Sequence, residues 1–223
     1  LKKIPASAHP MDVMRTGTSM LGNLEPEGDF SNQLNSINRM IATMASIVTY
    51  WYKYSHEGED ISLVNDEDSM AGHFLHILHG KTPSDLHRKV MDVSLVLYAE
   101  HEFNASTFTG RVCASTMSDI HSCVVAAIGS LRGPLHGGAN EKAMELIENW
   151  TSREEAKENI LAMLANKEKI MGFGHAVYSI RDPRNAVMKE YAKGVSLLHD
   201  KETLNQVGEE VEKVKADEKK MFA

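Results

Sequence analysis

Residues 133–140 read Gly-Pro-Leu-His-Gly-Gly-Ala-Asn, which places His136 among three glycines. The stretch follows an apolar run that ends near Leu131, and the residues from Asn140 onward have the pattern of a new helix. Glycines permit a positive φ and let another group approach the backbone closely. The N-terminus of a helix offers unpaired N–H groups to an anion or to a developing negative charge. The stretch therefore predicts either a site built around His136 or a tight turn between helices in which the histidine is incidental.

A second cluster repeats this combination of glycines and a histidine. Residues 171–178 read Met-Gly-Phe-Gly-His-Ala-Val-Tyr, in which the histidine is His175. Seven residues after it, Asp182-Pro183-Arg184 has the pattern of a helix start, and we expect Asp182 to cap that helix. The guanidinium of Arg184 is suited to bind a carboxylate through two parallel hydrogen bonds.

A third cluster lies where a predicted apolar helix over residues 84–100 ends. Residues 100–107 read Glu-His-Glu-Phe-Asn-Ala-Ser-Thr and contain His101. Together, His101, His136, His175 and Arg184 predict a site that binds a polycarboxylate and polarises carbonyl oxygens. The alternative is a helical scaffold whose turns happen to contain histidines.

Composition restricts the classes of partner. The formal net charge is −7 and the sequence has no long basic run, which argues against nucleic acid as a ligand. A small anionic ligand needs only a local positive pocket and stays possible. The longest apolar stretch, near residues 123–128, is too short to span a membrane. The two cysteines lie on apolar helical stretches and are expected to be free thiols in a reducing compartment, the cytoplasm or a mitochondrial matrix.

Helical periodicity runs through almost the whole chain, which predicts an all-α fold. The pattern predicts helices over residues 34–54, 84–100, 119–131, 140–150 and 152–166, and a charged, solvated helix over 201–220 whose only apolar stripe is Val207, Val211 and Val214. After residue 137 the predicted helices are amphipathic and charged on their outer faces, and this change suggests a domain boundary there.

Three histidines, His73, His76 and His79, recur at every third position of a short predicted helix. They span too wide an arc for a simple three-ligand metal set, and no cysteine or carboxylate partner falls at ligand spacing. Polar packing roles are therefore favoured, and no metal site is predicted.

The three histidine clusters, in this order along the chain, resemble the signature segments of the citrate synthase family. Three further segments resemble the 2-methylcitrate synthase branch of that family. They are residues 50–56 (Tyr-Trp-Tyr-Lys-Tyr-Ser-His), 72–80 (Gly-His-Phe-Leu-His-Ile-Leu-His-Gly) and 102–104 (Glu-Phe-Asn).

The resemblance implies a citrate synthase-like multi-helical fold and a homodimer with two domains in each subunit. Residues 1–137 would belong to the large domain and residues 138–223 would form the small domain, with the catalytic cleft between them. The implied reaction condenses propionyl-CoA with oxaloacetate to give 2-methylcitrate. An ordinary citrate synthase that uses acetyl-CoA is the alternative within the family.

The resemblance also implies roles for particular residues. His136 would stabilise the enol or enolate of the thioester, and His175 would protonate the ketone oxygen of oxaloacetate. His101 and Arg184 would bind oxaloacetate. CoA would lie along Ile170, Met171, Gly172, Phe173 and Gly174. CoA is substrate and product here, so no permanently bound cofactor, metal, nucleic acid or membrane partner is implied.

Three residues of the family pattern have no counterpart in the sequence. In this family a catalytic aspartate, the base for the α-carbon of the acyl-CoA, follows shortly after a segment resembling Lys219-Lys220-Met221-Phe222. That aspartate and two later arginines that bind substrate carboxylates fall outside these 223 residues. We therefore expect no turnover from the 223 residues alone, and a non-catalytic helical protein kept for dimerisation or ligand binding remains the competing hypothesis.

Overall fold

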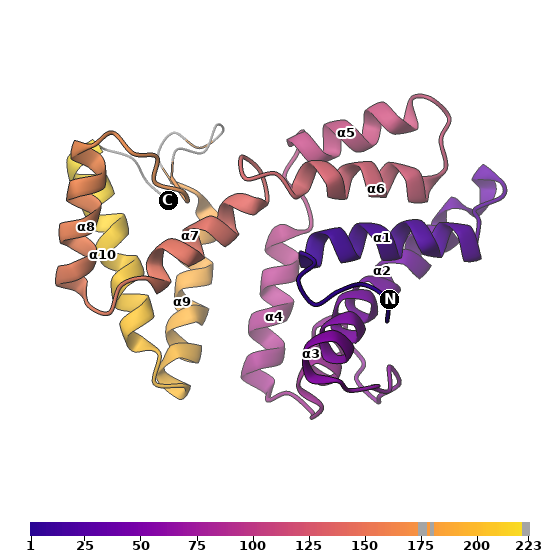
Figure 1. Cartoon of the computed structure of the whole chain (residues 1–223), viewed down its shortest axis with the longest axis horizontal. Coiled ribbons are helices and arrows are strands. Elements are labelled where there is room, and N and C mark those ends of the chain that lie inside the picture. Colours follow the sequence, from indigo (N-terminus) through magenta and orange to yellow (C-terminus); the bar gives the residue numbers. More distant parts are fainter. Residues whose placement is uncertain (174–177, 179–180, 220–223) are drawn as a thin grey trace. The chain divides into compact units, whose positions relative to one another are not determined.

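The computed structural model describes residues 1–173, 178 and 181–219. Over these residues the chain is built of helices and contains no strand, which confirms the predicted all-α class (Figure 1). It divides into two compact units, Leu1–His136 and Gly137–Ala223. That division falls one residue before the boundary suggested by the sequence. The identification of the units with a large and a small domain stays a prediction.

Unit 1, as we call residues 1–136, has a long helix, α2, at its centre. Helices α1, α3 and α6 all pack against it, and α5 lies along α6 (Figure 1). Trp51 of α2 is 2% exposed and packs with Val13 of α1. The helices of unit 1 are α1 (Pro10–Leu24), η1 (Phe30–Asn32), α2 (Gln33–Tyr52), η2 (Lys53–Glu57), α3 (Met70–His79), α4 (Asp85–Tyr98), α5 (Ala105–Ala114) and α6 (Ile120–Leu131), of which η1 is a 3₁₀ turn and η2 a π turn.

Side-chain caps fix where the helices of unit 1 begin. Ser69, Ser84, Asn104 and Asp119 each accept a hydrogen bond from a backbone N–H in the first turn of α3, α4, α5 and α6 respectively. Such caps satisfy donors that have no partner within the helix, and each stabilises its helix by about 1 kcal/mol. The cap on α5 lies at the helix start that contacts His136.

Unit 2, as we call residues 137–223, holds α7 (Gly138–Glu148), α8 (Arg153–Ala165), α9 (Pro183–Leu198) and α10 (Glu202–Lys219). Helix α10 packs against each of the other three (Figure 1). The core of the unit consists of Ala156, Ile160, Ile170, Val207, Val211 and Val214.

The prediction of a solvated helix at the end of the chain was wrong. Val207, Val211 and Val214 of α10 are 0%, 3% and 5% exposed, and they form half of the unit's buried core. Spacings of four and three residues place the three valines on one face of the helix, and that face packs against α8. A stripe of three valines is therefore enough to anchor a highly charged helix.

Within the described ranges, no helix combines the length and the apolar character that crossing a membrane requires.

Candidate functional site

His136 lies in the turn between α6 and α7 and contacts the first turn of α5. Its Nε2 atom is 3.2 Å from the backbone nitrogen of Ser106, whose N–H donates to it, and 2.8 Å from Ser106 Oγ. The backbone of His136 closes the turn, because its N–H donates to the carbonyl of Gly133 at 2.9 Å. The ring is thus held from both sides, by its own turn and by a helix thirty residues earlier in the chain.

This geometry fixes the protonation state of the His136 ring. The N–H of Ser106 points at Nε2, so a proton on Nε2 would face another proton. The neutral ring therefore carries its proton on Nδ1. Burial lowers the pKa of His136 below its usual value, because the charged imidazolium loses more hydration than the neutral ring. The partial positive charge at the start of α5 disfavours the cation as well.

Asn104 organises the start of α5 and connects the His101 segment to His136. Its Oδ1 atom accepts a hydrogen bond from the backbone of Thr107 at 3.0 Å and lies 2.7 Å from Ser106 Oγ, whose single proton goes either to this oxygen or to His136 Nε2. Its Nδ2 donates to the backbone carbonyl of His101 at 3.5 Å. The structure therefore brings two of the three histidine clusters together, with Ser106 and Asn104 between them. His101 is half-buried and enters this network through its carbonyl group.

Arg184 is paired with Asp182 at the start of α9. Its Nε lies 3.0 Å and 3.1 Å from the two carboxylate oxygens of Asp182, and Nη2 lies 2.6 Å from Oδ2. Asp182 also accepts from the backbone N–H of Arg184 at 2.9 Å, which confirms its predicted role as the helix cap. The side chains are 23% and 16% exposed, so the guanidinium is presented in one fixed orientation.

The segment predicted to lie along CoA is anchored in unit 2. Ile170 is 4% exposed and belongs to the core, so its side chain is not available to a ligand. Met171 is half-buried, and Gly172 adopts a φ of +90°. A Cβ atom at Gly172 would lie 3.3 Å from the Cβ of Ala143. Phe173 packs against the same core. Gly174 and His175 lie outside the described residues.

Two histidines of α3, His73 and His76, lie close to polar groups of unit 1, whereas His79 is exposed. His73 lies 3.0 Å from Asn65 Nδ2 and 3.4 Å from Ser46 Oγ. His76 Nδ1 lies 3.6 Å from a carboxylate oxygen of Glu67. These contacts agree with the predicted packing role. In the part of the chain that the structure describes, no group of three histidine, cysteine, aspartate or glutamate side chains is placed to hold a metal ion.

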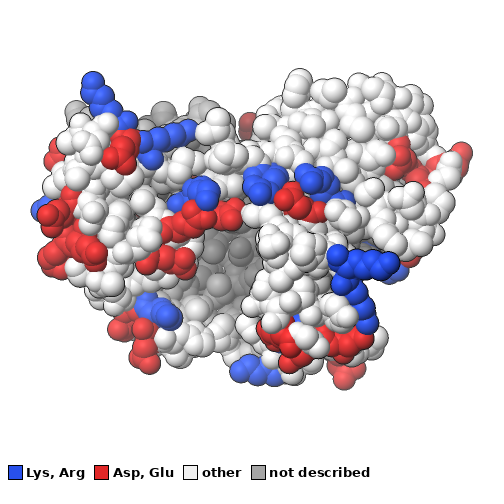
Figure 2. Space-filling model, in the orientation of Figure 1, with Lys and Arg blue, Asp and Glu red and all other residues white. Residues whose placement is uncertain are grey.

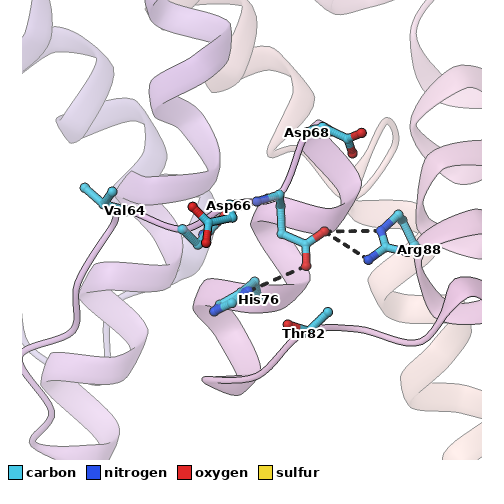
Figure 3. A pocket seen from close by; sticks show the side chains of 8 residues that line it. Val64, Asp66, Asp68, His76, Thr82 and Arg88 are labelled. Carbon is cyan, nitrogen blue, oxygen red and sulfur yellow. Dashed lines mark hydrogen bonds and ion pairs between the residues drawn. The ribbon is translucent and has the colours of Figure 1, made fainter.

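A cavity of about 660 Å³ opens beside His76 (Figure 3). The carboxylate of Glu67 is 6% exposed and accepts from Arg88 Nε and Nη2 at 3.2 Å and 3.0 Å. In the cavity lining, the carboxylate of Glu67 is thus paired with Arg88, whereas His76 Nδ1 is buried without a hydrogen-bond partner among the residues that the structure describes. None of the described residues predicted to bind substrate lines this cavity, so size alone does not make it the active site.

On the face shown in Figure 2, lysines and arginines are interspersed with aspartates and glutamates and do not gather into one basic surface.

The family model for the citrate synthase C-terminal domain matches residues 1–223. The chain belongs to the citrate synthase family. This confirms the resemblance inferred from the three histidine clusters.

Relatives extend over the whole chain. It is 58% identical over 222 residues to a 2-methylcitrate synthase of Shewanella oneidensis, and the matched region covers 100% of this chain and 59% of that protein. It is 40% identical over 220 residues to a citrate synthase of Deinococcus radiodurans, covering 97% of this chain and 58% of that protein. The chain thus spans about three fifths of the length of these relatives.

Solved structures share the fold. The citrate synthase of Thermotoga maritima matches with a TM-score of 0.78 at 30% identity, over 99% of this chain and 58% of that one. The citrate synthase of Thermoplasma acidophilum, solved as a ternary complex with carboxymethyl coenzyme A and oxaloacetate, matches with a TM-score of 0.89 at 24% identity, over 99% and 60%.

Sequence reasoning missed the polar partner of His136. Ser106 was part of a quoted segment but had no assigned role, although Asn104 followed by a helix is a recognisable cap pattern. That pattern could have predicted a helix start at Ala105. It could not have predicted that His136 is the side chain that this helix start contacts.

Proposed function

We propose that the protein containing this chain condenses propionyl-CoA with oxaloacetate and water to form 2-methylcitrate and CoA. A carbon–carbon bond forms between the α-carbon of the propionyl group and the ketone carbon of oxaloacetate, and water then cleaves the thioester. The name of the relative at 58% identity supports this reaction. The observation that carries the proposal is the position of the His136 ring, which accepts from the Ser106 N–H at the start of α5 and whose pKa is lowered by burial.

His136 acts on the thioester. Removing a proton beside a thioester is difficult, because negative charge accumulates on the thioester oxygen. A donor that is already oriented stabilises this charge without reorganisation, and losing one such donor typically costs about 3–4 kcal/mol. With Nε2 occupied by the N–H of Ser106, the Nδ1–H of His136 is the donor that meets the oxygen.

The other predicted site residues act on oxaloacetate and CoA. His175 protonates the ketone oxygen as the new bond forms. Arg184 and His101 bind oxaloacetate, and Arg184 binds a carboxylate because its guanidinium is held in a fixed orientation by Asp182. Backbone groups of residues 170–174 lie along CoA, which agrees with the burial of the Ile170 side chain. Asp182 is occupied as cap and ion-pair partner, so we do not assign it as the base for the α-proton.

The proposal extends to the assembly. Unit 1 is taken as part of the large domain and unit 2 as the small domain of a homodimeric enzyme of the cytoplasm or mitochondrial matrix. Large apolar side chains on α5 support burial against a further surface, since Phe108 and Val112 are 63% and 50% exposed. The reaction as written requires no permanently bound cofactor.

The test measures kcat/KM of the complete protein with propionyl-CoA and with acetyl-CoA, at saturating oxaloacetate. The two substrates differ by one methylene, which is worth about 1–3 kcal/mol in an apolar pocket, so we expect both to react and propionyl-CoA to react at least as efficiently. A preference of tenfold or more for acetyl-CoA would make the protein an ordinary citrate synthase. Absence of turnover with either would leave the non-catalytic hypothesis standing.

A further inference from the structure

Lys215 is a buried lysine on α10 that the reaction described above does not use. Its residue surface is 5% exposed, whereas Lys213 on the same helix is exposed. The ammonium of Lys215 lies 5.3 Å from the centroid of the Phe173 ring. Phe173 belongs to the segment to which we assign CoA binding, forty-two residues earlier in the sequence.

Lys215 is one of three anchors on that segment, and all three lie within unit 2. Ile170 is buried in the core, and Gly172 lies so close to Ala143 of α7 that a side chain would crowd it. Both contacts are apolar. The third anchor is the charged one, the ammonium of Lys215 over the ring of Phe173. Phe173 directly precedes Gly174 and His175 in the sequence.

The cation of Lys215 attracts the face of the Phe173 ring directionally, and this attraction restrains where the ring lies.

We propose that Lys215 is a positioning residue for acyl-CoA binding. It holds the Phe173 ring, and through it the backbone of residues 170–173, in the conformation that receives CoA. The inference rests on the proposed function, because it assumes that this segment binds CoA.

The experiment compares Lys215→Met, Lys215→Arg and the control Lys213→Met with the wild type, all in the complete protein. Initial rates give KM for propionyl-CoA and for oxaloacetate separately. Thermal unfolding reports stability, and calorimetric titration with CoA reports binding without turnover. For Lys215→Met we expect KM for propionyl-CoA and Kd for CoA to rise about five- to thirtyfold, with an unchanged KM for oxaloacetate. Lys215→Arg keeps the cation and restores most of the affinity, and Lys213→Met has no effect.

Two results would overturn the inference. One is an affinity of Lys215→Met for CoA within twofold of the wild type. The other is a lower Tm together with equal losses for both substrates, which marks a lysine that only supports packing. A wild-type protein that binds CoA but does not turn over refutes the proposed reaction and leaves Lys215 to be judged by the titration. A wild-type protein that does not bind CoA refutes both.

Discussion

Ser106→Ala tests whether the His136 ring is oriented as the structure indicates. The substitution removes Oγ, which lies 2.8 Å from Nε2, and leaves the backbone N–H that donates to the same atom at 3.2 Å. The tautomer of His136 is therefore kept, and only one of its two restraints is lost. A single hydrogen bond between neutral groups contributes about 0.5–1.5 kcal/mol net. If that contribution is expressed fully in the transition state, kcat falls about two- to twelvefold.

The assay is steady-state turnover of the complete protein at saturating propionyl-CoA and oxaloacetate. Thr107→Ala is the matched control, because Thr107 is the next residue on α5 and is exposed. His136→Ala sets the scale and should lower kcat by a factor of at least about one hundred. If Ser106→Ala matches His136→Ala, the backbone N–H does not suffice to orient the ring. If Ser106→Ala has no effect on kcat, the Oγ contact plays no part in catalysis. Either result refutes the reasoning.

Two further predictions concern charge. The pKa of His136 is lowered by burial, so the ring should titrate below about pH 6.5 and carry its proton on Nδ1 above that pH. The ¹⁵N chemical shifts of the imidazole report both the pKa and the tautomer. A pKa above 6.5 would contradict the assignment of His136 as a neutral donor. The pKa of His136 is lower in the folded state than in the unfolded state. The stability that the neutral ring contributes is therefore present above about pH 6.5 and is lost as the pH falls through the folded-state pKa. His136→Gln should remove this pH dependence. A lysine at position 184 cannot reproduce the two-pronged contact with Asp182, so Arg184→Lys should raise KM for oxaloacetate about tenfold or more and leave KM for propionyl-CoA unchanged. Arg181→Lys, at an exposed position, is the control. A change in KM for propionyl-CoA alone would reject the assignment of Arg184 to oxaloacetate.

The sequence was sufficient for the fold class because helical periodicity is a local signal. It located most of the helices, but it missed α5 and some of the ends of the others. Helix α7 begins at Gly138 and not at Asn140, because two glycines of the turn already follow the helical path. Helix α1 begins at Pro10, as expected for a proline in a first helical turn, but its cap is His9, whose ring accepts from the backbone of Met11 at 3.1 Å. Histidine is an unusual cap, and no propensity argument would have chosen it.

The candidate site was predictable only in part, since its partners are distant in sequence. The glycines marked the turn around His136, and Asp182-Pro183-Arg184 marked a helix start that the structure confirms. By contrast, Ser106 reaches His136 across thirty residues, and such pairs follow from how α5 and α6 pack. The stripe on α10 was recognised as apolar but taken as solvated, because burial depends on what α8 presents to it.

The pairing of Arg184 with Asp182 has a consequence for how a polycarboxylate is bound. An arginine already matched by a carboxylate supplies orientation and hydrogen-bond donors, while its charge is largely compensated. His136 contributes no charge either, because its ring is held neutral. Oxaloacetate carries two carboxylates, so the two described groups do not between them neutralise it. If the proposed reaction holds, further cationic groups of the complete enzyme must supply that charge. Arg184 and His136 then orient the substrate: the guanidinium of Arg184 is held by Asp182, and the neutral ring of His136 is held by Ser106.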